Sequence, residues 1–303
     1  MLQTIKKAFT FAEIMKISGF TIIKNAIKND YPVLEAITSI LPVVDEMIVA
    51  VGDSEDDTVD LIRSIASDKV RIVHSVWDPE KRKGGEILAI ETNKVFDQIS
   101  ADSDWGLYIQ ADEAVHEKYH SSIRAAAEKY LHDERVEGLL FRYLHFYGSY
   151  DYVGASRKWY DKEVRIIRND KRIRSFRDAQ GFRKNGEKLK VKLIDAYIYH
   201  YGWVKDPVQM KQKMYNAGKL WHSDEEMNAF LQSGEAFDFN EFDVLAKFAD
   251  THPAVMEERI KRKNWNLELD ITKKNISFKN KVLTWYEKMT GKRLFYFTNY
   301  RII

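Results

Sequence analysis

The chain has 303 residues, 45% of them hydrophobic, and no cysteine, so it can bury a substantial core but forms neither disulfides nor thiolate zinc sites. Its 48 basic and 46 acidic residues leave a formal net charge of +2, which argues against a protein that binds nucleic acid or an acidic polymer over its whole surface. No stretch approaches the ~20 consecutive apolar residues that a spanning helix needs, so we expect a cytoplasmic protein.

The first part of the chain alternates short apolar runs with helical patterns. Strands are predicted at residues 19–23, 47–51, 70–73 and 105–109, and helices at 30–41, 59–65 and 86–98. Asp30 and Pro32 suit the cap and the first turn of the first helix. Alternation of this kind implies right-handed crossovers and a mostly parallel α/β sheet with helices on both faces.

Beyond residue 109 the pattern changes. A helix is predicted at 117–131 and strands at 138–143, 163–168 and 190–199, which we interpret as a mixed-strand extension of the sheet. A long polar connection, 169–188, separates the last two strands, and such a loop inside a compact domain is usually functional or disordered. Asp206-Pro207 then begins a helical tail, with its clearer segments at 209–221, 224–231 and 253–261.

Two acidic clusters each follow an apolar run. The run at 47–51 breaks at GDSEDDT (52–58), and the run at 105–109 breaks at QADE (110–113). Ligands of open α/β sheets bind at the carboxyl ends of the strands. Because hard divalent cations take oxygen ligands and often share them with substrate phosphates, the two clusters predict a cation and a phosphorylated ligand at this edge.

The order of these elements resembles that of the family 2 glycosyltransferases of the GT-A fold. It comprises a first strand that ends at Asn25, a second that ends in the acidic turn 52–58, a helix that carries Asn93, and a fourth strand that ends at 110–113. The resemblance covers roughly residues 20–200.

The resemblance implies a GT-A-like, Rossmann-related catalytic domain at 1–203. Its nucleotide-sugar half would be about 20–113 and its acceptor half about 114–203, and 204–303 would be a mainly helical C-terminal extension. The implied activity is transfer of a sugar from a nucleotide-diphosphate sugar to a saccharide or other hydroxyl acceptor, assisted by Mn²⁺ or Mg²⁺ and with inversion at the anomeric carbon.

In that family the acidic turn after strand two holds the base of the nucleotide-sugar, and Asp53 is the matching residue. An Asp-x-Asp motif at the end of strand four holds the ribose and the metal, and here it reads Gln110-Ala111-Asp112. Gln110 brings no charge, so Asp112 would bind Mg²⁺ or Mn²⁺ only together with substrate phosphates. His200 is the second metal ligand implied, and the alternative is a histidine merely hydrogen-bonded among its aromatic neighbours.

A basic turn, KRKGG (81–85), brings lysines and free backbone N–H groups to a helix start, where they could bind a diphosphate. A solvated basic turn is the interpretation we slightly favour. The predicted nucleotide-sugar site consists of Asn25, Asp53, Glu55, Lys83, Asn93, Gln110 and Asp112.

An inverting transferase needs one carboxylate near the acceptor hydroxyl. Asp178, in the polar connection after the 163–168 strand, is our candidate for this catalytic base, because the resemblance places an acceptor loop there. Asp151 and Glu113 are its rivals, and Glu113 could instead orient a neighbour. A carboxylate in a charged loop can equally be solvated and without a role.

Two further stretches carry alternative interpretations. The aromatic residues of 147–160 could form a sugar-stacking platform or pack in the core. The aromatic and basic segment 273–303 can lie on an anionic membrane surface, at the inner face of the membrane. Lipid-linked glycan acceptors would be found there. The segment can also dock on the catalytic domain, which is the interpretation we favour.

Two other functions stay open at this point. A nucleotidyltransferase also uses an α/β sheet and a carboxylate-held metal, but we find no glycine-rich phosphate loop near the first strand. A non-catalytic nucleotide- or glycan-binding module is the other, because Gln110 replaces the first aspartate of the motif.

Overall fold

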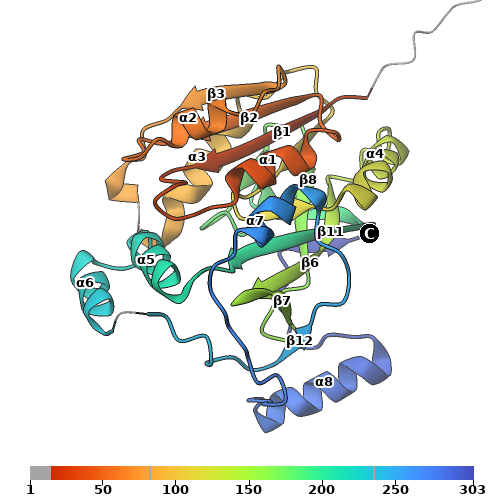
Figure 1. The fold of residues 1–303 in the computed structure, drawn as a ribbon. Coiled ribbons are helices and arrows are strands. Elements are labelled where there is room, and N and C mark those ends of the chain that lie inside the picture. The colour runs from red at the N-terminus through yellow and green to blue at the C-terminus, as the bar shows by residue number, and fades with distance from the viewer. Residues whose placement is uncertain (1–14, 82, 235) are drawn as a thin grey trace, which may run out of the picture.

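A computed structural model describes residues 15–81, 83–234 and 236–303 (Figure 1). Its centre is a mixed sheet in which neighbouring strands follow the order β3-β2-β1-β4-β8-β6-β11-β10-β9. These strands are β3 (Val70–His74), β2 (Glu46–Val51), β1 (Ile17–Ile23), β4 (Trp105–Tyr108), β8 (Lys162–Arg168), β6 (Gly138–Tyr147), β11 (Glu187–Trp203), β10 (Phe182–Lys184) and β9 (Ile173–Ser175).

The strand directions match the predicted α/β class. Strands β3, β2, β1 and β4 are all parallel. Strand β8 runs antiparallel to both of its neighbours, β4 and β6, and β11 runs parallel to β6. The prediction of a GT-A-like α/β fold, with a mostly parallel half and a mixed extension, is therefore confirmed.

Helices cover both faces of the parallel half, which is why its strands are apolar at nearly every position. Helices α1 (Val33–Ile40), α2 (Thr58–Arg63) and α4 (His120–Lys129) pack in one core cluster with β1, β2 and β4. Helix α3 (Glu86–Phe96) packs on the opposite face, where Phe96 meets Phe20 of β1 with ring centroids 5.3 Å apart.

Short strands from distant parts of the chain, which the sequence did not predict, extend the sheet. Strand β5 (Glu113–Val115) pairs with β11, and β7 (Ser149–Gly154) pairs with β6. From the predicted helical extension, β12 (Leu245–Lys247) pairs with β7 and β13 (Tyr300–Ile302) with β11. Residues 204–303 are thus joined to the sheet, and the division into two domains stays a prediction.

The C-terminal helices are α5 (Pro207–Gly218), α6 (Asp224–Gln232), α7 (Glu257–Lys261) and α8 (Phe278–Thr290). Short 3-10 helices lie at Pro79–Lys81, Lys83–Gly85, Glu117–Tyr119 and Ala254–Met256. Asp206 caps α5 as expected, because its side chain accepts hydrogen bonds from the backbone of Val208 and Gln209. Within the described residues, no helix combines the length and hydrophobicity that crossing a membrane requires.

Two local predictions are wrong. Asp30 does not cap α1, which begins after Pro32; Asp30 has a φ of 47° and its carboxylate pairs with Arg259. The connection 169–188 is also not one loop, because β9 and β10 form a hairpin within it. Residues 176–181 form the irregular tip of this hairpin.

Candidate active site

A cleft of about 500 Å³ lies where β1 and β4 end, the edge predicted from the sequence. Asn25 lines it from the end of β1, Gln110 and Asp112 from the end of β4, and Trp77 from the loop after β3. Lys213 of α5 lines it as well. The cleft is therefore built from segments that lie far apart in the sequence.

A buried ion pair holds the turn that follows β4. Both oxygens of the fully buried Glu113 carboxylate accept hydrogen bonds from Arg165, and Tyr143 Oη donates to Oε1 at 2.5 Å. The backbone N–H of Gln110 donates to Glu113 Oε2 at 3.0 Å. The carboxylate of Glu113 is thus engaged by Arg165, Tyr143 and the backbone of Gln110, so it braces the turn that carries Gln110 and Asp112.

Asp112 lies between a lysine and a histidine side chain. Its Oδ2 lies 3.2 Å from Lys213 Nζ and 3.7 Å from Nε2 of His200 on β11. Burial alone would raise the pKa of the Asp112 carboxyl, but Lys213 and then His200 hold this pKa far below its ordinary value. Asp112 is therefore ionised at neutral pH.

A close backbone approach keeps this cluster compact. A Cβ built on Gly202 would lie 2.5 Å from His200 Nε2 and 2.6 Å from Asp112 Oδ2, so only glycine fits there. The backbone N–H of Tyr201 donates to the Asp112 carbonyl at 2.7 Å.

The donor set limits the kind of metal site that can form. Across the described residues, no group of three or more His, Cys, Asp or Glu side chains could hold a metal ion. Asp112 Oδ2 and His200 Nε2 lie 3.7 Å apart and could supply one carboxylate and one imidazole ligand, while His200 Nδ1 is buried with no hydrogen-bond partner among the described residues. Such a pair fits a divalent cation that takes its remaining ligands from substrate phosphates.

Trp77 and Lys24 line the cleft and both contact Asp53, which does not itself line it. The Trp77 backbone N–H donates to Asp53 Oδ1 at 3.2 Å. Lys24 Nζ lies 2.8 Å from the same oxygen. Burial would raise the pKa of Asp53, but the hydrogen bonds from Lys24 and Trp77 bring it below its ordinary value. A planar ring could lie on Trp77 with a charged acceptor beside it.

The other predicted nucleotide-sugar residues have different surroundings. Asn25, whose φ of 54° suits asparagine, lines the cleft and accepts a 2.7 Å hydrogen bond from the Glu55 backbone. The exposed Glu55 side chain pairs with Lys28 at 2.5 Å outside the cleft lining. Asn93 Oδ1 accepts from the Ser175 backbone at 2.7 Å, which ties α3 to β9. The side chain of Lys83 lies outside the described residues.

A second cavity, of about 340 Å³, adjoins the cleft. Gln110 and Asp178 line both, and Tyr160, Glu163 and Tyr296 line the second one only. The boundary between two cavities is where two bound molecules could react.

Asp178 is held at this boundary by an irregular loop. The residues on either side of it, Arg177 and Ala179, have φ values of 56° and 60°, in the left-handed region that costs L-residues free energy. Asp178 Oδ1 is buried, and no described residue hydrogen-bonds to it. Its rival Asp151 is exposed, accepts from Ser149 Oγ and lines neither cavity.

Sequence reasoning missed several residues of the two cavities. Lys213 lies 101 positions after Asp112, and no local pattern links the two. Asn216 of α5 donates a 2.8 Å hydrogen bond to Asn29 across the cleft. Glu163 on β8 is largely buried, with 13% of its side chain exposed, and burial raises its pKa to about 7 although Arg165 opposes the shift. No sequence pattern singles out Glu163, because four of the seven residues of β8 are charged.

The suggested sugar-stacking platform is mostly core. Tyr147, Tyr150 and Tyr152 are at most 8% exposed and belong to aromatic core clusters. Tyr160 alone of the five aromatic residues proposed lines a cavity.

Comparisons with known proteins give structural neighbours only. No family model matches the chain, and no curated protein matches it. S. aureus TarS 1-349 in complex with UDP is 15% identical, with 72% of this chain and 70% of that chain covered and a TM-score of 0.40. The 4-diphosphocytidyl-2C-methyl-D-erythritol synthase of Anaerococcus prevotii is 16% identical, with 72% and 99% covered and a TM-score of 0.40.

A third neighbour is the glucosyl-3-phosphoglycerate synthase of Mycobacterium tuberculosis in complex with Mn²⁺, UDP and phosphoglyceric acid. It is 24% identical, with 43% of each chain covered and a TM-score of 0.29. At these TM-scores and identities the neighbours carry no argument about function, and the activity has to be inferred from the site itself.

Proposed function

We propose that this protein transfers a sugar from a nucleoside-diphosphate sugar to a hydroxyl group of a saccharide or related acceptor. The supporting observation is that a nucleotide-sized cleft and a smaller cavity meet at Gln110 and Asp178. A donor in the first and an acceptor in the second would bring the anomeric carbon and the hydroxyl to one point, which is the main requirement for transfer.

The donor site follows from the polar groups along the cleft. The nucleobase would lie on Trp77 beside Asp53, and Gln110 would hydrogen-bond a ribose hydroxyl. The diphosphate would lie near Lys213, whose ammonium is the cation closest to Asp112. The nucleobase would then lie near the end of β3, the ribose near the end of β4 and the diphosphate beside α5.

Charge that develops on the leaving diphosphate needs fixed positive groups. Lys213 supplies one from α5. A Mn²⁺ or Mg²⁺ ion held by Asp112 and His200 would add Lewis-acid stabilisation of the leaving phosphate when bound. Asp112 keeps its negative charge at neutral pH because Lys213 and His200 lie beside it.

Asp178 is the proposed base. As the acceptor oxygen bonds to the anomeric carbon, the bond from that carbon to the phosphate oxygen breaks, and the acceptor proton passes to the Asp178 carboxylate. The electron pair of the broken bond leaves with the nucleoside diphosphate. Attack from the acceptor cavity, opposite the leaving group, would invert the anomeric carbon without a covalent enzyme intermediate.

Turnover of nucleotide-sugars tests this proposal. Purified protein is incubated with UDP-, GDP-, CDP- and dTDP-sugars, with Mn²⁺ and a mixture of saccharide acceptors, and the release of nucleoside diphosphate is measured. One nucleotide family should be consumed, and Asp112→Asn should reduce its turnover by about 10²-fold or more. Asp151→Asn, which removes an exposed carboxylate outside both cavities, is the matched control.

Two results would contradict the proposal. Release of pyrophosphate from a nucleoside triphosphate, with every nucleotide-sugar left intact, would indicate a nucleotidyltransferase. Tight nucleotide-sugar binding with no turnover in any acceptor mixture would indicate a binding module.

A further inference from the structure

Helix α8 exposes an apolar stripe. Phe278, Val282, Trp285 and Met289 are 83%, 47%, 64% and 69% exposed. Their spacings of four, three and four residues place them within a sector of about 60° at ~100° per residue. A continuous apolar face of this kind, open to solvent, marks an interaction surface.

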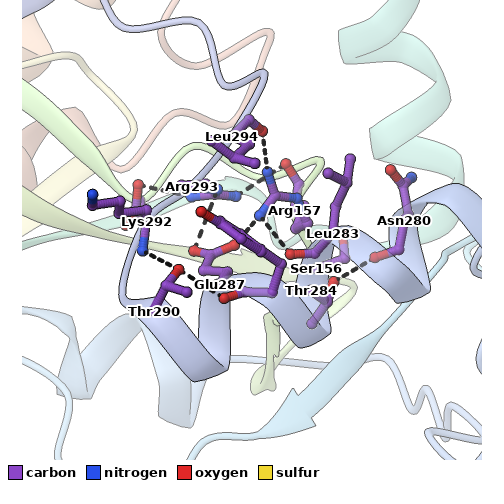
Figure 2. Close-up of polar contacts among 12 residues, drawn as sticks. Ser156, Arg157, Asn280, Leu283, Thr284, Glu287, Thr290, Lys292, Arg293 and Leu294 are labelled. Carbon is purple, nitrogen blue, oxygen red and sulfur yellow. Dashed lines mark hydrogen bonds and ion pairs between the residues drawn. The ribbon is translucent and has the colours of Figure 1, made fainter.

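The opposite face fixes the helix to the rest of the molecule (Figure 2). Arg157 forms an ion pair with Glu287 and donates to the carbonyl of Leu294 at 2.6 Å. Arg293 donates to the carbonyls of Arg157 and Trp159, each at 3.0 Å. The stripe therefore points away from the body of the protein, because the helix is held from its other side.

Two further exposed aromatic residues follow the helix in the chain. Gly291 ends α8 in the left-handed conformation, with a φ of 68°. Phe295 and Phe297 follow with exposed fractions of 89% and 63%. Two phenyl rings and an indole are thus presented on one short segment.

The segment that carries this surface is strongly basic. Residues 273–303 contain eight basic residues and one acid, Glu287, whereas the whole chain has a formal net charge of +2. Glu287 is already paired with Arg157 and Arg293. By helical spacing, Lys281 and Lys288 lie on one flank of the stripe and Lys279 on the other.

We infer that α8 and the segment after it dock on the surface of an anionic phospholipid bilayer. Helix α8 has the composition of a helix that lies in the bilayer interface, because its apolar face contains Trp and Phe and is flanked by lysines. Anionic headgroups complement its charge, at about 1 kcal/mol for each lysine near the surface. A nearly neutral chain with one strongly basic apolar face suits a lipid surface better than an apolar protein groove.

The docked surface would lie close to the second cavity. Tyr296, Phe297, Asn299 and Tyr300, which line that cavity, directly follow the helix. If the proposed function holds, the acceptor would then be a glycan carried by a membrane lipid. Binding to the bilayer itself does not depend on that function, so the two can be tested separately.

Vesicle cosedimentation tests the inference in the absence of any donor or acceptor. The full chain is mixed with phosphatidylcholine vesicles that contain or lack phosphatidylglycerol. We expect binding only to the anionic vesicles, weakened by added salt because screening reduces the lysine contribution. The double variant Trp285→Ser with Phe295→Ser should bind about tenfold or more weakly. Val208→Ser, at an exposed apolar position on α5, is the matched control and should bind as the wild type does.

The variants should keep their fold, because the replaced side chains are largely exposed, and circular dichroism checks this. Equal binding of the wild type and the double variant, or no binding to anionic vesicles, would overturn the inference. A concentration-dependent dimer that the double variant abolishes, without vesicle binding, would assign the surface to a second copy of this chain instead. Nucleotide-sugar turnover of the double variant on a water-soluble acceptor should equal that of the wild type.

Discussion

Asp178 is the residue on which the proposed chemistry depends most. It lines both cavities, its Oδ1 has no hydrogen-bond partner among the described residues, and a loop with left-handed φ values holds it. Asp178→Asn should leave donor binding unchanged and reduce turnover by about 10²- to 10⁴-fold, because the amide cannot accept the acceptor proton. Donor Kd and kcat, measured separately, check this. A variant with wild-type kcat would move the base to another carboxylate, with Glu163 as the nearest candidate.

Glu163 gives a prediction on pH. Burial raises its pKa to about 7 from an ordinary value of 4.5, while Arg165 opposes the shift. The stability that neutral Glu163 provides is fully present below about pH 4.5 and is lost as the pH rises through about 7. Glu163→Gln should therefore gain stability over the wild type between about pH 5 and about pH 8, by on the order of 2 kcal/mol.

Urea unfolding of both proteins at the two pH values measures this difference. Glu134→Gln, on an exposed loop, is the control and should show no pH-dependent gain. A constant difference between wild type and Glu163→Gln at both pH values would show that Glu163 does not titrate in this range.

A substitution at Gly202 tests the proposed metal site without removing Asp112 or His200. The Cβ of an alanine would overlap His200 Nε2 and Asp112 Oδ2, so Gly202→Ala should separate the pair. We expect Mn²⁺-dependent nucleotide affinity to fall about 10- to 100-fold, as for other changes around metal ligands. Gly19→Ala, which crowds Met47 in the core and not the cluster, should lower stability but keep the affinity. Unchanged titration curves for Gly202→Ala would argue against a metal at this position.

Among the individual site residues, the strand-end positions were predictable and their partners were not. Asn25, Gln110 and Asp112 follow apolar runs, so the sequence places them at the sheet edge, where the cleft lies. Lys213 of α5 and Trp77 of the loop after β3 line the same cleft, but no sequence motif marks either residue. Their approach depends on tertiary packing, which local patterns do not encode.

At the scale of the elements, α5 forms a wall of the cleft although the sequence suggests only a helical tail. It contributes Lys213 and Asn216, and the backbone of Leu220 after it accepts a 2.9 Å hydrogen bond from Gly85. Helix α5 thereby connects the α3 side of the cleft to the β11 side.

The contribution of α5 to donor binding can be measured. Asn216→Ala removes the hydrogen bond to Asn29 and should raise the donor KM by about 2- to 10-fold with little change in kcat, because one hydrogen bond contributes ~0.5–1.5 kcal/mol. Asn228→Ala, which removes a 3.0 Å hydrogen bond between α5 and α6, is the matched control. Equal KM values for Asn216→Ala and the wild type would remove α5 from the donor site.

The long periodic elements were predicted well, and the short ones were not. Strands β1 to β4 and helix α3 are apolar at the expected spacing, and they lie within a few residues of the predicted bounds. Strands β5, β9, β10, β12 and β13 each have three residues, too few to show an alternating pattern. Four of them pair with a longer strand, β5, β10 and β13 with β11 and β12 with β7, and β9 pairs with β10.

At the scale of the whole molecule, the two cavities use nearly the full length of the chain. The cleft is lined from Ile22 to Trp221, and the second cavity reaches Tyr300. In the proposed function the parallel half and α5 would form the donor side. The proposed acceptor side would depend on segments near the C-terminus, which the sequence left as an extension.

The central claim is that the cleft binds a nucleoside diphosphate together with a divalent cation. A thermal-shift panel of UDP, GDP, CDP and dTDP, each with and without Mn²⁺, tests it most directly, because a ligand that binds the native state raises Tm by mass action. We predict that one nucleotide raises Tm and that Mn²⁺ enlarges the shift. If no nucleoside diphosphate shifts the Tm of the folded protein under either condition, the cleft binds another class of ligand and the account is wrong.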